Sequence, residues 1–381
     1  MTLKLTNSFL TSPSVKITFT DILSRFVKYL DSNVLLPSLE KQEVIVIVMD
    51  VIILHLQRLE KRGLEVSEED KVLYMRGGVD EMDESDIMKE SEQEYKDAQQ
   101  NLDSIGLTRV VVKAISHCKN EVVRTKALEL VHNMMKNGNS TVQLSINKIL
   151  TTEETDGAFF FKIRELIRQG GEDLKEYRNV RKLSEARSES LVEGCLSVIL
   201  VFEMMSQLCE GHQSITQNLL REQSSNARSA NLIGESMDYF CVLAKSLACV
   251  RKWNDVEAQC GLGVLQFLTE AVQGPCSVNQ EVILTRAKCI DSCLSILSAK
   301  LKNVQDVGLA SDLVCSVSVL LSACLESRES PDLAKSLFNQ VPIAIIADRL
   351  KLVANKMQVL KKKVSERSAR GGWVVASELL Y

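Results

Sequence analysis

The chain has 381 residues, 45% of them hydrophobic, and a formal net charge of −4 at pH 7. This length and hydrophobic content allow one large core or roughly two to three smaller ones, and they exclude a disordered chain. The charge balance gives no reason to expect nucleic acid as a partner, because phosphate binding needs a clear basic excess. Only 5 prolines and 17 glycines occur, a composition that favours long helices over strands.

The eleven cysteines do not form the pattern of a secreted disulfide scaffold, since the count is odd and no C-x-x-C pair occurs. Most lie in apolar helical stretches, where a free thiol behaves as a small buried hydrophobe, so we expect a reducing, cytoplasmic location. Residues 1–10 lack the architecture of a signal sequence. The most apolar run, at 44–56, contains Asp50 and is shorter than the roughly 20 residues of a bilayer span. We therefore expect no membrane span in this chain.

Apolar residues recur at helical spacing almost throughout the sequence. Gly138 is expected to end one helix in a left-handed conformation, with Asn139 or Ser140 capping the next. Gly274 and Pro275 stop a later helix. The predicted helices lie, in chain order, at 20–30, 38–62, 105–117, 121–136, 191–209, 226–249, 256–272, 279–299, 305–326 and 342–364.

Helices of roughly 12–25 residues joined by short loops predict antiparallel pairs stacked side by side. The expected fold class is therefore all-α, an armadillo/HEAT-like helical solenoid, although no sequence repeat recurs at a fixed period. The expected organisation is an N-terminal helical segment at 1–64, an acidic flexible linker at 65–103, a helical repeat region at 104–169, a polar linker or exposed helix at 170–189, a second helical domain at 190–364 and a tail at 365–381.

The stretch at 65–103 holds 14 acidic and 4 basic side chains. Such a run is typical of a solvated, mobile loop, and low-affinity calcium buffering is the alternative for the same residues. The stretch at 170–189 is polar and begins with Gly170 and Gly171, which leaves both a linker and an exposed helix open.

Signatures of an enzyme are missing from the sequence. There is no phosphate-binding loop of the Walker type, no G-x-G-x-x-G after a strand, no G-x-S-x-G and no H-E-x-x-H. The four histidines are scattered, and none pairs with a cysteine at the spacing of zinc ligands. An EF-hand loop is also missing. We therefore expect that the chain is not an enzyme.

Longer strings carry more information than single residues. With them the chain resembles the inositol 1,4,5-trisphosphate receptor and ryanodine receptor family of calcium-release channels. The domain at 190–364 is similar to that family's receptor-homology-associated domain, and two flanking strings favour the inositol trisphosphate receptor branch. The strings are L-C-E-G-H at 208–212, Q-N-L-L-R-E-Q at 217–223, L-T-E-A-V-Q-G-P-C at 268–276, N-Q at 279–280, and, as flanking strings, G-N-S-T-V-Q at 138–143 with F-F-K at 160–162, and L-E-S-R at 325–328.

The resemblance implies that Glu210 and Glu270 bind the activating Ca²⁺, with His212 and Gln273 orienting the two carboxylates from the second shell. Elementary chemistry agrees, because Ca²⁺ takes six to eight oxygen ligands and the negative end of a helix dipole favours a cation. The alternative is that each glutamate ends a helix and faces solvent. Gly211 stands where the family has asparagine, which loosens the backbone beside Glu210.

The resemblance also implies the function and the partners. The chain is expected to be a calcium-sensing regulatory region at the cytosolic face of the endoplasmic reticulum, coupling calcium binding to gating. Its partners are the other domains of a tetrameric channel, above all the C-terminal domain, which supplies the third calcium ligand. Without the pore and that domain, the site in this chain is expected to be incomplete and weak. The alternative is a free-standing armadillo-like scaffold, derived from such a channel, that binds proteins along its groove.

Overall fold

The computed structural model describes residues 18–35, 38–75, 84–152, 157–223 and 229–327, with a few single positions between 335 and 351. Within these residues every regular element is a helix and no strand occurs. The prediction of an all-α helical solenoid is confirmed. The predicted helix at 342–364 and the tail at 365–381 lie almost wholly outside the described residues.

The chain forms two compact units, Met1–Glu165 with Glu203–Ala230, and Leu166–Phe202 with Asn231–Tyr381. Two long helices, α8 and α10, contribute residues to both units. The boundaries therefore differ from the linear order of domains expected from the sequence, because the segment 203–230 packs with the first unit.

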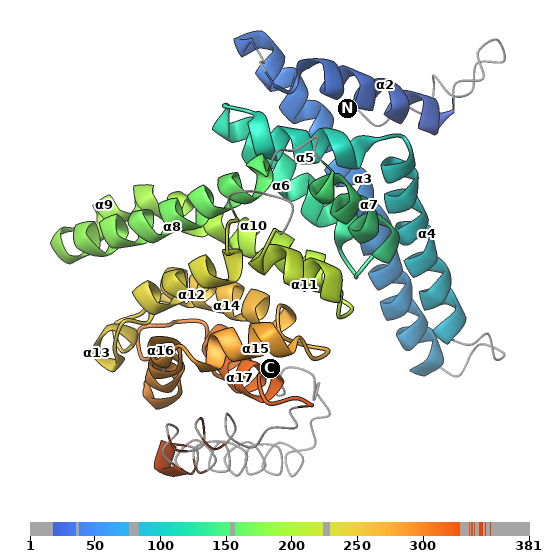
Figure 1. Ribbon diagram of the computed structural model, residues 1–381. Coiled ribbons are helices and arrows are strands. Elements are labelled where there is room, and N and C mark those ends of the chain that lie inside the picture. Colours follow the sequence, from blue (N-terminus) through green and yellow to red (C-terminus); the bar gives the residue numbers. More distant parts are fainter. Residues whose placement is uncertain are drawn as a thin grey trace. The chain divides into compact units, whose positions relative to one another are not determined.

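The first unit is built on a pair of long helices, α3 and α4, which lie side by side (Figure 1). Helix α6 packs on α3, and α5 packs on α6 and α7. Fully buried aliphatic side chains such as Ile45, Met49 and Ile52 from α3 and Val131 from α6 fill the core. Its elements are α2 (Phe19–Asn33), α3 (Leu39–Met75), α4 (Glu84–Ser104), α5 (Leu107–His117), α6 (Glu121–Met135), α7 (Ser140–Thr151) and α11 (Ser214–Arg221), with the start of α8 (Ala158–Leu183) and the end of α10 (Val192–Cys209).

The second unit is organised around α14, which packs on α12 and α17. Its core contains a group of aromatic side chains: the rings of Phe202 and Tyr239 lie 5.2 Å apart, and Phe202 stacks on Phe267 at 6.3 Å. Its elements after the first part of α10 are α12 (Leu232–Leu243), α13 (Leu247–Val250), α14 (Asp255–Glu270), α15 (Ser277–Leu284), α16 (Ala287–Ser298) and α17 (Val307–Ala323), and before it lie the rest of α8, α9 (Glu185–Ser188) and the short 3-10 turn η2 (Glu189–Leu191).

Local signals in the sequence set most helix starts. Asn120, Asn139 and Asn254 each cap a helix by accepting a hydrogen bond from the backbone N–H three residues on. Gly138 has φ +66° and Gly274 has φ +89°, the left-handed conformation expected where each helix stops. The turn Gly138-Asn139 therefore works as predicted.

The structure departs from the expected organisation in the stretch predicted to be an acidic linker, and at 170–189 it decides between the linker and the helix that the sequence left open. Residues 84–104, all but the last of which belong to the predicted acidic linker, form α4, and α3 extends to Met75. Residues 170–183 continue α8 as a helix. Gly170 does not break this helix, because a Cβ atom there would lie only 2.7 Å from Val198 Cβ, so the glycine permits close packing of α8 on α10. The predicted helix at 279–299 is two helices, α15 and α16.

Helix α10 is the one described helix that is long and apolar enough to span a membrane by length and composition. It has 18 residues, and its buried side chains include Cys195, Val198, Phe202 and Leu208. These side chains pack within the protein, so we interpret α10 as a core helix.

Candidate functional site at two helix ends

Glu210 directly follows the last residue of α10, in the first unit. The backbone after it turns through two left-handed residues, Gly211 at φ +76° and His212 at φ +61°. The Glu210 side chain is half-buried. Burial raises the pKa of the Glu210 carboxyl, and a hydrogen bond with the Gln207 side chain partly offsets this rise. Ionisation of the Glu210 carboxyl is therefore less favourable in the folded protein than in water.

The surroundings of Glu210 are rich in oxygen atoms that accept hydrogen bonds. Its Oε2 atom is buried and has no hydrogen-bond partner among the described residues, and the same holds for Oε1 of Gln207 and of Gln143. Gly138 comes close enough that a Cβ atom on it would lie 3.5 Å from Glu210 Cδ. A cation would satisfy such oxygens, whereas further carbonyl or carboxylate groups would not.

A buried glutamine fixes the end of α10 beneath Glu210. Gln143, which is fully buried, donates from Nε2 to the backbone carbonyls of Gln207 at 2.6 Å and Glu210 at 3.0 Å. The last carbonyls of a helix have no partner within the helix, so one amide group satisfies two of them. The backbone that carries the Glu210 side chain is thereby held from α7.

The same arrangement occurs at two other helix ends. Gln99 donates to Asn133 O and Lys136 O, both at 3.0 Å, at the end of α6. Gln280 donates to Ala323 O at 2.9 Å and Glu326 O at 3.2 Å, at the end of α17. In all three cases the glutamine is fully buried and bonds two carbonyls three residues apart. We call this arrangement the glutamine clamp.

Glu270 is the last residue of α14, in the second unit, and is half-buried. The two predicted calcium ligands thus belong to different units. Gln273 is half-buried in the turn that follows α14, and His212 is exposed. Next to this turn, the Gly274 N–H donates to Glu326 Oε2 at 3.5 Å, so Glu326 supports the turn from the end of α17.

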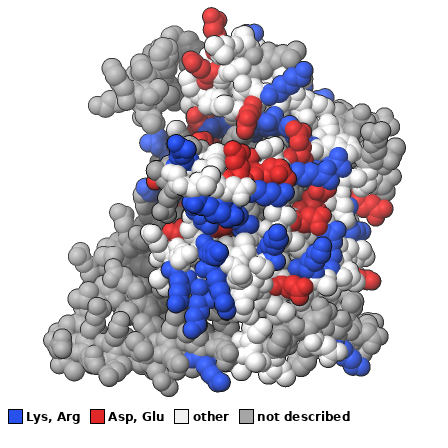
Figure 2. Space-filling view, turned by 90° about the vertical axis from the view of Figure 1, so that its left-hand side faces the viewer, with Lys and Arg blue, Asp and Glu red and all other residues white. Residues whose placement is uncertain are grey.

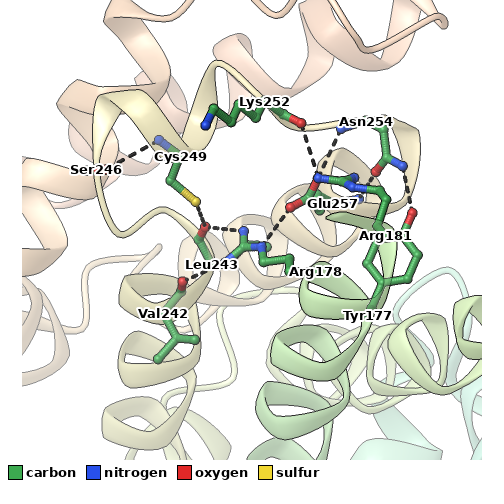
Figure 3. A network of polar contacts seen from close by, with 10 residues as sticks. All are labelled: Tyr177, Arg178, Arg181, Val242, Leu243, Ser246, Cys249, Lys252, Asn254 and Glu257. Atoms are coloured by element: carbon green, nitrogen blue, oxygen red, sulfur yellow. Dashed lines mark hydrogen bonds and ion pairs between the residues drawn. The ribbon is translucent and has the colours of Figure 1, made fainter. Parts of the chain in front are cut away.

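The opposite end of α14 carries a buried carboxylate that accepts three hydrogen bonds, within a cluster that was not predicted from the sequence (Figure 3). The Glu257 carboxylate accepts from Arg178 Nε and from Arg181, each at 2.7 Å, and from the backbone N–H of Asn254 at 3.1 Å. Only 2% of the Glu257 side chain is exposed, against 14% for Arg178.

The two arginines also bond the backbone around Glu257. Arg178 donates to the carbonyls of Val242 at 3.0 Å and Leu243 at 2.6 Å, at the end of α12. Figure 3 shows both guanidinium groups pointing from α8 toward Glu257. The only sequence signal was the i, i+3 spacing of Arg178 and Arg181, which places both on one face of a helix. The cluster joins α8, α12 and α14 and fixes the start of the helix that ends at Glu270.

Charges elsewhere in the second unit lie at its surface. Figure 2 shows basic and acidic side chains together on one face of the described chain. Arg168 and Glu235 make two hydrogen bonds of 2.8 and 2.5 Å, and Arg286 pairs with Asp238. Such exposed pairs contribute little to stability, in contrast to the buried cluster at Glu257.

The described residues give a partial fit to Ca²⁺. No group of three or more His, Cys, Asp and Glu side chains gathers with metal-binding geometry among them. At Glu210, however, one carboxylate oxygen has no hydrogen-bond partner among the described residues, and the same holds for one amide oxygen each of Gln207 and Gln143, whose residues are in contact with this helix end. Carboxylate and amide oxygens are the ligands that Ca²⁺ prefers. The donor chemistry at Glu210 therefore fits this ion.

Comparison with known proteins agrees with the strings found in the sequence. Residues 194–297 match the family described as RyR and IP3R Homology associated. The inositol 1,4,5-trisphosphate receptor itr-1 of Caenorhabditis elegans is 30% identical over 164 residues, which make up 41% of this chain and 5% of that receptor. The matched part is thus a small portion of that relative's length. The matched range, 194–297, contains Glu210 and Glu270.

Proposed function

The chain belongs to the inositol 1,4,5-trisphosphate receptor and ryanodine receptor family through residues 194–297, and we propose that it is a calcium-responsive regulatory segment of an intracellular calcium-release channel. Within that family it is similar to the inositol trisphosphate receptor branch. We place it at the cytosolic face of the endoplasmic reticulum, in contact with the other domains of such a channel.

The observation that carries this proposal is the state of Glu210. Its carboxylate is half-buried, its pKa is raised by burial, and one of its oxygens has no hydrogen-bond partner among the described residues. A buried carboxylate oxygen without a hydrogen-bond partner is unfavourable. Calcium, when bound, supplies the positive charge that offsets this cost. Gln143 on α7 holds the backbone carbonyl of Glu210, and Gly138, in the turn before α7, lies close enough to the side chain that a Cβ atom on it would be 3.5 Å from Glu210 Cδ.

Glu270 is the second residue to which we assign the calcium response, with His212 and Gln273 as orienting groups. Its support is the L-T-E string and its place at the end of α14, where the partial negative charge of the helix dipole favours a cation. The cluster around Glu257 fixes the start of α14, so Glu270 is carried at the end of a rigid helix. Any movement of α14 would therefore be passed to the helices around it, which is the physical basis for coupling to gating.

Calcium titration of the purified chain by calorimetry tests the proposal. We expect weak binding, which Glu270→Gln and Glu210→Gln each reduce at least tenfold, because each removes one charged ligand. The matched control is Glu222→Gln, which also removes a carboxylate directly after a helix end, that of α11, and is expected to leave binding unchanged. Equal titration heats for the wild type and the double Glu210→Gln/Glu270→Gln variant would overturn the assignment of these residues.

A further inference from the structure

Helix α3 carries four apolar side chains on the face that points away from its own unit. Their exposed fractions are 44% for Val44, 60% for Ile47, 41% for Val51 and 57% for Leu54. The spacing of 3, 4 and 3 residues puts all four on one line along the helix. We call this line the α3 stripe. The opposite face, with Ile45, Val48, Met49, Ile52, Ile53 and Leu56, is buried in the first unit.

The α3 stripe is not an ordinary scatter of surface hydrophobes. Other exposed large apolar side chains of the described residues, such as Val122, Leu144 and Ile215, lie on different helices. Single exposed residues of that kind need no explanation, whereas a contiguous apolar patch of a few hundred Å² marks an interaction site. On α2, Phe19 is also exposed, at 41%, and its ring lies 4.7 Å from that of His55 on α3.

The spacing of the stripe is that of a coiled-coil seam. Val44 and Val51 fall at one seam position of the heptad, and Ile47 and Leu54 fall at the other. In an antiparallel pair of helices, a residue at one seam position of the heptad packs against a residue at the other seam position of the partner helix. Two copies of α3 would then bring Val44 against Leu54 of the second copy, and Ile47 against Val51, with the two-fold axis midway.

The charges at the ends of the stripe select the same arrangement. One turn before Val44 lies the exposed Glu40, and one turn after Leu54 lies the exposed Arg58. Both fall on the line of the stripe, so the antiparallel pairing that joins Val44 to Leu54 also joins Glu40 to Arg58 of the second copy. This happens twice, once at each end, because such an interface is self-complementary. A parallel pairing would instead bring like charges together.

Asp50 lies beside the two-fold axis, where it approaches Asp50 of the second copy. Its carboxylate is already paired with Lys126 at 2.8 Å in the same chain. Lys126 is also bonded to Glu129 at 2.6 Å. The ion pair reduces the repulsion between the two aspartates, so Asp50 does not forbid the pairing.

We propose that the α3 stripe is a self-association surface, on which a second copy of this chain docks α3 antiparallel to α3. The proposal does not rest on the calcium response and concerns a different face of the first unit. The small apolar area predicts weak association, with a Kd on the order of 10 µM.

Sedimentation of the full chain between about 1 and 100 µM tests the proposal. The wild type is expected to pass from monomer to dimer, and Ile47→Glu to remain monomeric with at least a 100-fold weaker association, because two charges would be buried unpaired. The matched control is Val122→Glu. It replaces an exposed apolar residue on α6, outside the α3 stripe, and is expected to leave dimerisation unchanged. A wild type that stays monomeric would overturn the proposal and show that another segment or protein covers the stripe.

A charge exchange separates the antiparallel pair from other assemblies. Glu40→Arg and Arg58→Glu are each expected to weaken dimerisation about tenfold, since each affects two ion pairs of up to about 1 kcal/mol. The double variant restores it, because the pairs re-form with the signs exchanged. A double variant weaker than both single variants would exclude the antiparallel arrangement, and so would dimerisation that Ile47→Glu does not affect. Circular dichroism verifies that each variant folds.

Discussion

The two candidate glutamates end helices that are held in opposite ways. In the first unit, Gln143 bonds the backbone of Glu210 itself, so the anchor and the carboxylate lie at the same helix end. In the second unit, the buried cluster around Glu257 holds the start of α14, and Glu270 lies thirteen residues further on, roughly 20 Å along the helix. The first anchor is neutral and local, and the second is charged and acts through a rigid helix.

The comparison teaches what each kind of anchor can do. A substitution at Gln143 should displace the backbone of Glu210 directly. It should therefore weaken calcium binding, with a modest loss of the protein's stability. A change at Glu257 should cost much stability but reach Glu270 only by displacing the whole of α14. The glutamine clamp at Gln280 provides an internal reference, because it has the same geometry as that at Gln143 but ends at Glu326.

The largest expected effect is that of Glu257→Ala. It leaves Arg178 and Arg181 without their carboxylate in a largely buried place, which costs about 3–5 kcal/mol. Denaturant unfolding, followed by the fluorescence of the buried Trp253 in the same unit, measures the loss. The control is Glu235→Ala, which breaks an ion pair with the exposed Arg168 and should cost less than about 1 kcal/mol. Equal losses in the two variants would contradict a structural role for the buried cluster.

The next effect compares the two clamps. Gln143→Leu and Gln280→Leu each remove the side-chain donor of two backbone carbonyls and should cost about 1–3 kcal/mol. Thermal unfolding should show similar losses for both, and none for the exposed Gln266→Leu. Calorimetry should then separate them, because only Gln143→Leu weakens calcium binding. A calcium effect of equal size in Gln280→Leu would show that the clamp acts through global stability alone.

The sequence predicts features that depend on neighbours along the chain. Asn139 caps α7 and Gly138 turns left-handed as expected, since both follow from backbone hydrogen bonds within a few residues. The hydrogen bonds of Gln143 and Glu257 were not predicted, because their partners lie 64 to 79 residues away and no local pattern marks those contacts. The choice between a linker and a helix at Gly170 was left open for the same reason: the side chain of Val198, which requires a glycine there, is remote in sequence. Family strings, not physical patterns, identified Glu210 and Glu270.

A smaller effect is expected at Gly138, where two costs can be separated. Gly138→Ala strains a backbone with φ +66°, which costs about 1–2 kcal/mol, and places a methyl group 3.5 Å from Glu210 Cδ. Gly106→Ala strains a similar backbone, at φ +90°, but has no heavy atom within 4 Å of the new Cβ. Both variants should lose similar stability by thermal unfolding, and Gly138→Ala alone should also change calcium affinity. Identical calcium binding in the two would remove Gly138 from the site.

The smallest effect is the pH dependence that Glu210 confers. Because burial raises its pKa in the folded state, the protonated carboxyl is favoured on folding, and stability is lost as pH rises from the ordinary glutamate range through the raised pKa. Glu210→Gln should therefore match the wild type in acid and be slightly more stable than it at neutral pH without calcium. Glu203, whose pKa burial also raises, gives the control: Glu203→Gln should change stability with the same sign while leaving calcium titration unaltered. In the wild type, protons and calcium compete for the same carboxylate, so calcium affinity should fall as pH is lowered, and a wild-type affinity independent of pH would argue against Glu210 as a ligand.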